Sequence, residues 1–296
     1  MKGFKDEIEK IVISASRRTD IPAFYMDWFM EGIERGSFTV PNPVSGQMMT
    51  VAATADKIHT IVFWSKNFGP FLAARYGQEL IRRGFNLFFQ FTINSEDRIL
   101  EPAIPPLDER LRQAQDLSRE FGPQVIAWRF DPICFYQHEP GEKVCDNLQD
   151  FDRIAQALSR LGIRRCITSF MDDYGKIRKR IRSRPGFKFI YPGIEEQIKI
   201  LLEMEKKLAA LSIDLYTCCE KELVSLLPSD SRIRPSSCIP NDFFQKLFGG
   251  RLCLQIDYGQ RHAQGCRCKL SRDIGSYHLQ PCHHKCLYCY ANPDGG

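Results

Sequence analysis

The stretch Thr60-Ile-Val-Phe-Trp-Ser-Lys-Asn67, with the apolar run Phe85-Asn-Leu-Phe-Phe-Gln-Phe91 that follows it, decides the fold of this 296-residue chain. Both runs are short and rich in β-branched and aromatic residues, which is typical of strands buried on both faces. Between them, residues 70–83 have the pattern of a helix that ends at Gly84. Two buried strands joined by a helix predict a parallel pair.

The same alternation extends in both directions from this unit. We expect further strands at 11–13, 125–130, 166–170 and 213–217, an extended piece at 37–43, and helices at 22–35, 107–121, 144–161 and 193–211. This order predicts an α/β fold, with a complete or partial βα barrel related to the triosephosphate isomerase fold as the first choice and an open doubly wound parallel sheet as the alternative. Beyond residue 235 the periodicity fades. We therefore expect a barrel-like domain over 1–235 and a Cys-rich, mostly irregular segment over 236–296 that caps the barrel mouth.

Composition limits the class of protein. The chain is 43% hydrophobic and 26% charged, as in ordinary globular proteins, and no apolar run approaches the roughly 18 to 20 residues that cross a bilayer. The first residues carry acids and lack the apolar core of a secretory signal, so we expect a cytoplasmic protein without a membrane partner. A net charge of +5 tolerates an anionic partner but is far from that of a dedicated nucleic-acid binder. The sequence has neither a P-loop nor a Rossmann glycine motif.

Polar side chains follow the predicted strands at their carboxyl ends. In a βα barrel these ends meet on one face, where the active site lies. The residues concerned are Arg17, Arg18, Thr19, Asp20, Asn42, Lys66, Asn67, Thr92, Asn94, Arg129, Asp131, Ser169, Asp172 and Glu220. Among them, the catalytic candidates are Arg17, Arg18, Asp20, Lys66, Asn67, Arg129, Asp131 and Glu220.

Ordinary structural roles remain open for single members of this set. Asp20 has the position of an N-cap, Arg129 and Asp131 could form a structural ion pair, and Lys66 and Asn67 could be turn residues. As a group, the cations Arg17, Arg18, Lys66 and Arg129 predict a positive mouth. Such a mouth suits a small anionic substrate or a ligand carboxylate.

The cysteines are distributed unevenly along the chain. None of the twelve occurs before Cys134, and seven lie between Cys238 and Cys289. Disulfide scaffolds are mostly small secreted domains, so metal or cluster ligation explains this enrichment better. We expect Cys134, Cys145, Cys166 and Cys253 to be core or incidental residues.

The final stretch contains the spacing CxxxCxxC at Cys282, Cys286 and Cys289. Three thiolates on one tight loop can hold a cubane iron–sulfur cluster and leave its fourth iron without a protein ligand. Structural zinc is the rival interpretation, but zinc knuckles use separate pairs of cysteines. We expect His283 and His284, which lie inside the motif, to shape the loop more than to bind metal.

A second metal site follows from the remaining thiols. The pair Cys266-Arg-Cys268 lies in a polar loop and is a poor candidate for core packing. Its remaining ligands would come from Cys218, Cys219, Cys238 or Cys253, and the polar contexts of Cys218 and Cys238 favour these two. The occupant would be a second iron–sulfur cluster or zinc.

The terminal motif Cys286-Leu-Tyr-Cys-Tyr290 resembles the cluster motif of the radical S-adenosylmethionine superfamily, in the CxYCY form of the spore photoproduct lyase branch. Over nearly its full length, the sequence resembles the bacterial family catalogued as domain of unknown function 1848. The segments that carry this resemblance are Ser14-Ala-Ser-Arg-Arg-Thr-Asp-Ile-Pro22, Phe63-Trp-Ser-Lys-Asn67, Trp128-Arg-Phe-Asp-Pro132, Gly259-Gln-Arg261 and the terminal cysteines.

The superfamily resemblance implies a 4Fe-4S cluster whose open iron binds S-adenosylmethionine and cleaves it reductively, so that hydrogen is abstracted from a substrate. It also implies an electron donor such as a ferredoxin or flavodoxin. Tyr288 and Tyr290 would lie near the adenine or shield the cluster, and Asn94 and Ser169 are further cofactor-binding candidates. In the superfamily the motif follows the first barrel strand, whereas here it follows the last predicted strand.

Two other functions remain as alternatives. The chain could be a non-catalytic zinc or iron–sulfur protein whose basic segment 176–184 contacts nucleic acid, although this segment has few aromatic neighbours. Metal-dependent hydrolysis is disfavoured because the strand ends lack the His and Asp sets of such sites.

Overall fold

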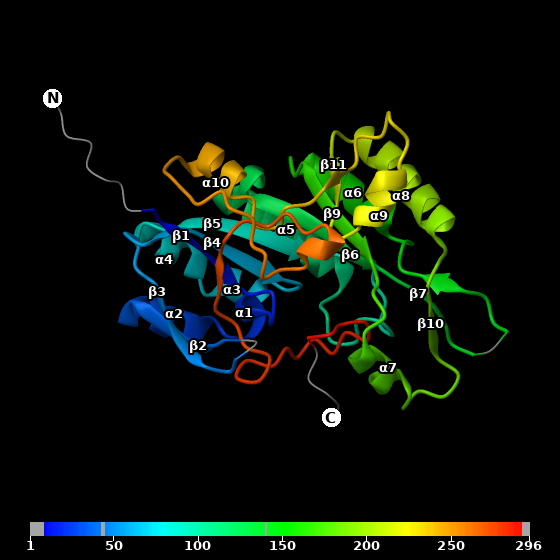
Figure 1. Ribbon diagram of the computed structural model, residues 1–296, viewed down its shortest axis with the longest axis horizontal. Helices are drawn as coiled ribbons and strands as arrows, with labels where there is room; N and C mark the ends of the chain where they lie inside the picture. Colours follow the sequence, from blue (N-terminus) through cyan, green and yellow to red (C-terminus); the bar gives the residue numbers. More distant parts are fainter. Residues whose placement is uncertain (1–8, 43–44, 140, 292–296) are drawn as a thin grey trace.

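The computed structural model describes residues 9–42, 45–139 and 141–291 and shows an α/β fold built on one eight-stranded sheet (Figure 1). All pairings within this sheet are parallel. In spatial order the strands are β12 (Arg234–Pro235), β11 (Asp214–Thr217), β9 (Arg165–Phe170), β6 (Ile126–Ile133), β5 (Asn86–Thr92), β4 (Ile58–Ser65), β1 (Ile11–Ala15) and β13 (Arg272–Asp273).

The sheet is open. Among the described residues, β12 and β13 lie at its two edges and do not pair with each other, so the sheet does not close into the complete form of the predicted complete or partial barrel. Each of these edge strands is only two residues long and offers little backbone for a closing pair. An open parallel sheet agrees with the alternative that the sequence favoured second.

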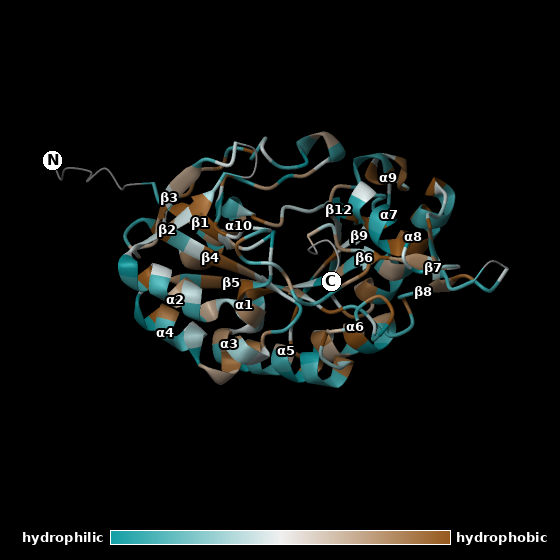
Figure 2. Cartoon of the chain, turned by 90° about the horizontal axis from the view of Figure 1, so that it is seen from below, coloured by the Kyte–Doolittle hydropathy of each residue, from teal (hydrophilic) through white to brown (hydrophobic). Residues whose placement is uncertain are grey.

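The helices that follow the strands pack beside the sheet. Figure 2 shows α2, α3, α4, α5 and α6 in a row along one side of it. The helices are α1 (Ile21–Phe24), α2 (Met26–Arg35), α3 (Gly69–Ala73), α4 (Tyr76–Arg82), α5 (Leu107–Phe121), α6 (Phe151–Arg160), α7 (Gly175–Ile181), α8 (Ile194–Ala209), α9 (Lys221–Leu226) and α10 (Asn241–Phe248). Two short 3-10 turns lie at Pro123–Val125 and His262–Gln264. None of the described helices is long and apolar enough to cross a membrane.

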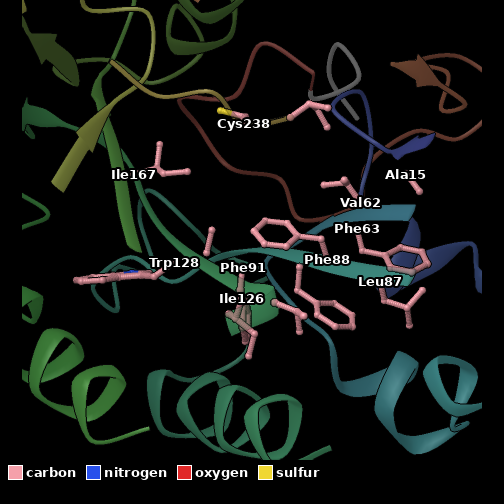
Figure 3. Packing of buried hydrophobic residues seen from close by; sticks show 14 of the residues in the cluster. Ala15, Val62, Phe63, Leu87, Phe88, Phe91, Ile126, Trp128, Ile167 and Cys238 are labelled. Carbon is pink, nitrogen blue, oxygen red and sulfur yellow. The ribbon is translucent and has the colours of Figure 1, made fainter. Parts of the chain in front are cut away.

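Strand β5 shows how the sheet is buried on both faces. Successive side chains of a strand point to opposite faces. Phe89 therefore packs on Phe121 of α5, with ring centroids 5.1 Å apart, whereas Phe88 packs on Phe244 of α10 at 5.0 Å. Gln90, on the face of Phe88, donates to the carbonyl of Cys238 at 2.8 Å. The apolar core thus reaches the cysteine-containing segment, and Figure 3 shows Cys238 among the core residues.

Three predicted elements differ from the structure. The helix expected at 70–83 is two helices, because Arg75 adopts a left-handed conformation with φ of 56° between α3 and α4. The helix expected at 144–161 begins only at Phe151, since β8 (Cys145–Asp146) occupies its first part and pairs with β7 (Phe135–Gln137) beside β10 (Lys188–Ile190). The extended piece at 37–43 is β2 (Ser37–Pro41), which pairs with β3 (Met48–Ala52) in a separate hairpin. Asn42 therefore does not follow a strand of the main sheet.

The chain after α10 returns to the main sheet. Its strand β13 pairs in parallel with β1, with Ile13 opposite Arg272 and Ser14 opposite Asp273. Cys266 and Cys268 also belong to the main core. The segment 236–291 therefore contributes a strand and core residues to the sheet, in addition to lying over the strand ends (Figure 1).

Candidate functional site

A cavity of about 320 Å³ lies at the carboxyl ends of the strands of the main sheet. Its lining comes from β1, β4, β5, β6, β9 and β11 and from the C-terminal segment. The predicted residues among its lining are Arg17, Lys66, Thr92, Arg129, Asp131, Ser169, Asp172, Cys218, Cys238, Cys266, Cys268, Tyr288, Cys289 and Tyr290. The cationic strand ends and both predicted cysteine groups thus contribute to one cavity.

Four of the catalytic candidates do not line this cavity and instead form hydrogen bonds with the protein around it. Asp20 caps α1 by accepting from the backbone N–H of Ala23 at 3.0 Å, which is the capping role considered from the sequence. Arg18 donates to the carbonyl of Gly275 at 2.9 Å, and Asn67 accepts from Gln113 at 2.8 Å. Glu220 accepts from the backbone N–H of Phe170 at 2.8 Å and lines a neighbouring hollow instead. These side chains position the strand ends.

The guanidinium groups of Arg17 and Arg129 lie on the ring of Trp64. Their Cζ atoms are 5.5 Å and 5.2 Å from its centroid. Arg129 pairs with Asp131, which also accepts from the hydroxyl of Ser169. The ion pair predicted as one alternative is therefore present, and it faces the cavity.

Asp273 of β13 holds the end of β1. Its carboxylate accepts from the hydroxyl of Ser14 at 2.8 Å, from the hydroxyl of Ser16 at 2.7 Å and from the backbone N–H of Arg17 at 2.8 Å. It is also the nearest carboxylate to the guanidinium groups of Arg17 and Arg18, at 4.0 Å and 3.9 Å. One acid therefore lies beside two half-buried cations.

A buried carboxylate, Glu101, organises the other side of the mouth. Its Oε1 atom accepts from Lys66 Nζ at 2.8 Å, from Asn94 at 2.9 Å and from the hydroxyl of Tyr288. Burial alone would raise the pKa of Glu101, but Lys66 and Arg110 outweigh it and hold this pKa below its usual value. Asn94 thus binds protein groups that position Tyr288.

Residues 282–289, which we call the terminal loop, are tied down at several points. The backbone N–H of Leu287 donates to Leu100 at 2.9 Å, and Arg180 donates to the carbonyls of Leu287 and Cys289 at 2.7 Å and 3.0 Å. The Nε2 atom of His284 lies 2.7 Å from Asp20 Oδ2, within hydrogen-bonding distance. Lys285 adopts a left-handed conformation with φ of 59°, which is uncommon for a residue with a side chain. The loop is therefore a defined structure.

The thiols of the terminal loop are buried or half-buried. Among the described residues, no three His, Cys, Asp or Glu side chains are arranged to hold one metal ion. Burial, with Asp20 nearby, raises the pKa of Cys282 to about 12, while backbone N–H groups of His284 and Asp20 at this thiol oppose the rise. Burial likewise raises the pKa of Cys286, and Lys66 opposes it. N–H donors and a cation at the sulfurs are the surroundings that a thiolate-bound cluster uses.

A second group consists of Cys218, Cys219, Cys238, Cys266 and Cys268, which we call the thiol ring. The sulfur of Cys218 lies 3.8 Å from that of Cys219 and 3.7 Å from that of Cys238. Cys266 and Cys268 line the same cavity as these three cysteines. Cys218, Cys238, Cys266 and Cys268 were predicted together as ligands of a second metal site. The structure places Cys219 beside them.

Charge accompanies the thiol ring. Hydrogen bonds from Cys218 and Cys268 hold the pKa of Cys238 well below its usual value against the effect of burial, and Arg129 adds to this with Nη1 at 3.0 Å from the sulfur. The guanidinium of Arg17 lies close enough to Cys268 to interact with it electrostatically. The ring is thus flanked by the two guanidinium groups that also contact Trp64.

Four residues of the site were not predicted from the sequence: Glu101, Asp273, Trp64 and Arg261. Cys219 was named only as a less favoured ligand. Glu101 follows the apolar pair Ile99-Leu100, and an isolated acid in such a setting could have indicated a buried partner. Asp273 gave no such sign, because β13 is too short for any periodicity.

Half of the basic residues of segment 176–184 contact other parts of the chain, whereas Lys179, Arg182 and Arg184 are exposed. Besides the contacts of Arg180 to the terminal loop, Arg178 pairs with Asp173 at 3.2 Å and Lys176 lies 5.8 Å from the ring centroid of Tyr277. This arrangement supports a role of α7 in holding the terminal loop.

Comparison with known proteins gives a family and no named activity. No curated protein matches the sequence significantly. The family model described as Domain of unknown function (DUF1848) matches residues 12–291, from β1 to the end of the described chain, and thus includes the cavity lining and both cysteine groups. The chain belongs to the DUF1848 family.

Proposed function

We propose that the protein is an iron–sulfur enzyme of the radical S-adenosylmethionine type, with a 4Fe-4S cluster held by Cys282, Cys286 and Cys289. The observation that carries this proposal is the position of the CxxxCxxC loop, whose Cys289 faces a cavity at the strand ends beside three cations. A structural metal knuckle would have no need for such a cavity.

When bound, such a cluster supplies the electron that cleaves S-adenosylmethionine and so starts hydrogen abstraction from a substrate. The chain itself would bind and orient the ligands. Arg17 and Arg129 present guanidinium groups that suit the carboxylate of the cofactor or of a small anionic substrate. Tyr288, fixed by Glu101, and Tyr290 would limit the access of water to the cavity.

The electron has to come from outside the chain, so we propose a ferredoxin or flavodoxin as the donor. None of the described cysteines forms a disulfide. A reducing compartment such as the cytoplasm would preserve them.

Anaerobic purification and reconstitution, followed by absorption and electron paramagnetic resonance spectra, tests the proposal. We expect the absorption of an iron–sulfur cluster, and a change in the resonance spectrum of the reduced protein when S-adenosylmethionine is added. The Cys286→Ala variant should lose that response, whereas Cys145→Ala should retain it because Cys145 lies in β8, outside both cysteine groups. A cluster whose spectrum ignores the cofactor, or zinc without iron, would refute the proposal.

Cofactor binding tests the role of the cationic lining separately. We expect Arg17→Gln to weaken the binding of S-adenosylmethionine about tenfold, equal to about 1.4 kcal/mol, if its guanidinium binds the carboxylate. The matched control is Arg232→Gln, on an exposed arginine outside the cavity lining. Equal affinities of wild type and Arg17→Gln would assign the carboxylate to another group.

A further inference from the structure

Cys218 has a second and a third sulfur atom in contact with its own. Its sulfur lies 3.7 Å from that of Cys238 and 3.8 Å from that of Cys219. A disulfide bond joins two sulfurs at about 2.05 Å, so either pair would have to approach by about 1.7 Å to form one. Cys218 therefore has two candidate partners for a disulfide.

The covalent geometry of the chain favours Cys238 over Cys219 as the partner. Cys218 and Cys219 are consecutive, and the Cα atoms of consecutive residues are about 3.8 Å apart across a trans peptide. Disulfides usually span Cα distances of about 4.4 to 6.8 Å. A bond between neighbours would therefore strain the chain, whereas Cys238 comes from a separate segment.

The main sheet holds both members of this pair. The backbone N–H of Cys218 donates to the carbonyl of Thr168 in β9 at 2.8 Å. The carbonyl of Cys238 accepts from Gln90 in β5 at 2.8 Å. In addition, β12, which precedes Cys238, pairs in parallel with β11, which precedes Cys218. The contact of the two sulfurs is therefore fixed by the fold.

A guanidinium group distinguishes the two thiols. The Nη1 atom of Arg129 lies 3.0 Å from the sulfur of Cys238. The thiolate is the nucleophilic form of cysteine, and an adjacent arginine stabilises it. This contact assigns the role of the attacking thiol to Cys238 and that of the resolving thiol to Cys218.

A small oxidant can reach the pair through the cavity at the strand ends, because Cys218 and Cys238 both line it. A cavity of about 10 to 15 Å³ already holds one water molecule. The volume of about 320 Å³ found here has room for hydrogen peroxide beside the two sulfurs.

We propose that Cys238 and Cys218 form a reversible redox pair, which hydrogen peroxide oxidises to a disulfide. The sulfur of Cys238 attacks one peroxide oxygen, the O–O bond breaks, and the hydroxide that leaves takes up the proton lost by the thiol and becomes water. The thiol of Cys218 then attacks the sulfenic acid, the S–S bond forms and a second water leaves. Two thiols are thus oxidised while one peroxide is reduced to two waters.

A dithiol reductant reverses this reaction by thiol–disulfide exchange. Disulfides in reducing compartments are mostly transient bonds of this catalytic or redox-sensing kind. The inference needs no metal and does not depend on the proposed function.

The test treats the reduced full-length protein with hydrogen peroxide, blocks the remaining thiols by alkylation and maps tryptic peptides by mass spectrometry. Cys218 lies in the peptide 208–221 and Cys238 in the peptide 233–246, because trypsin does not cleave between Arg234 and Pro235. We expect these two peptides to be joined after oxidation and to separate after treatment with dithiothreitol. Cys218→Ser should lose the link, whereas the matched control Cys219→Ser should form it as the wild type does.

The wild-type map decides the question even where a variant fails to fold. The proposal is wrong if peroxide leaves the two peptides unlinked, or if dithiothreitol does not separate them. It is also wrong if Cys218→Ser keeps the link and Cys219→Ser loses it, since Cys219 would then be the partner. Release of a bound metal from the reduced wild type during oxidation would overturn it as well, because the thiols would then be ligands.

Discussion

The ammonium group of Lys66 lies 2.8 Å from Glu101 Oε1, and the side chains of the pair are only 15% and 3% exposed. The pair joins the end of β4 to the loop that precedes α5. The hydroxyl of Tyr288 donates to the same carboxylate oxygen, so this ion pair also anchors the terminal loop. The ion pair between Lys66 and Glu101 therefore also helps to hold the terminal loop in place.

Removing the carboxylate of this pair should destabilise the protein strongly. Glu101→Ala leaves Lys66 buried without its counterion, and breaking a buried pair in this way costs about 3–5 kcal/mol. Equilibrium unfolding in urea measures the change. The control is Asp108→Asn, which breaks the exposed pair with Arg153, whose side chains are 53% and 68% exposed, and should cost less than about 1 kcal/mol. A loss similar to that of the control would mean that water or another acid compensates Lys66.

Tyr288→Phe should loosen the terminal loop without disrupting the core. The variant removes one hydroxyl donor from Glu101, at an expected cost of about 1–3 kcal/mol because the site is buried. Trypsin cleavage after the exposed Lys285 should become faster, since this residue lies in the loop. Tyr258→Phe, on a side chain that is 73% exposed, is the control and should leave cleavage unchanged. Unaltered cleavage in Tyr288→Phe would show that Leu287 and Arg180 hold the loop alone.

The sequence was informative where periodicity or chemistry is local. The apolar run of β4 and the alternation of strands and helices predicted the parallel sheet, because strands buried on both faces read as continuous apolar runs. Polar residues after these strands predicted the lining of the mouth, and Arg17, Lys66, Arg129 and Asp131 do line it.

The features that the sequence did not predict depend on contacts between residues far apart in the chain. Asp273 binds Ser14 and Ser16 across more than 250 residues of chain, and no periodic pattern marks a two-residue strand. The sequence could not decide between a closed and an open sheet for the same reason, since closure depends on edge strands that leave no pattern. Cys219 was less favoured than Cys218, because only the left-handed backbone of the structure turns both thiols to the ring.

Acid should destabilise the protein through His59. Its side chain is 4% exposed and is held by Thr60 and by the carbonyl of Gly249, both at 2.7 Å. Burial lowers the pKa of His59 below its value in the unfolded chain. The unfolded chain therefore binds more protons below about pH 6.5, and the free energy of unfolding falls as the pH decreases through this range.

The His59→Gln variant should show a weaker dependence of stability on pH between about pH 5 and 7, because an amide does not titrate there. Urea unfolding at several pH values measures this slope. His262→Gln is the matched control, since His262 is exposed in the turn after Arg261. Equal slopes in wild type and His59→Gln would place the acid sensitivity in another group.

Gly275 should tolerate no side chain, because it lies against the end of β1. A Cβ atom at this position would stand 2.0 Å from Ser16 Oγ and 2.6 Å from Ser16 Cβ. Ser16 is buried and donates to Asp273, so Gly275→Ala forces apart the contacts that position Arg17. We expect a loss of about 1–3 kcal/mol in the free energy of unfolding. Gly193→Ala is the control, since its Cβ would meet no atom within 4 Å and its φ of −64° suits any residue. If Gly275→Ala were as stable as this control, β1 and β13 could separate without loss, and Asp273 would not be what fixes Arg17 at the mouth.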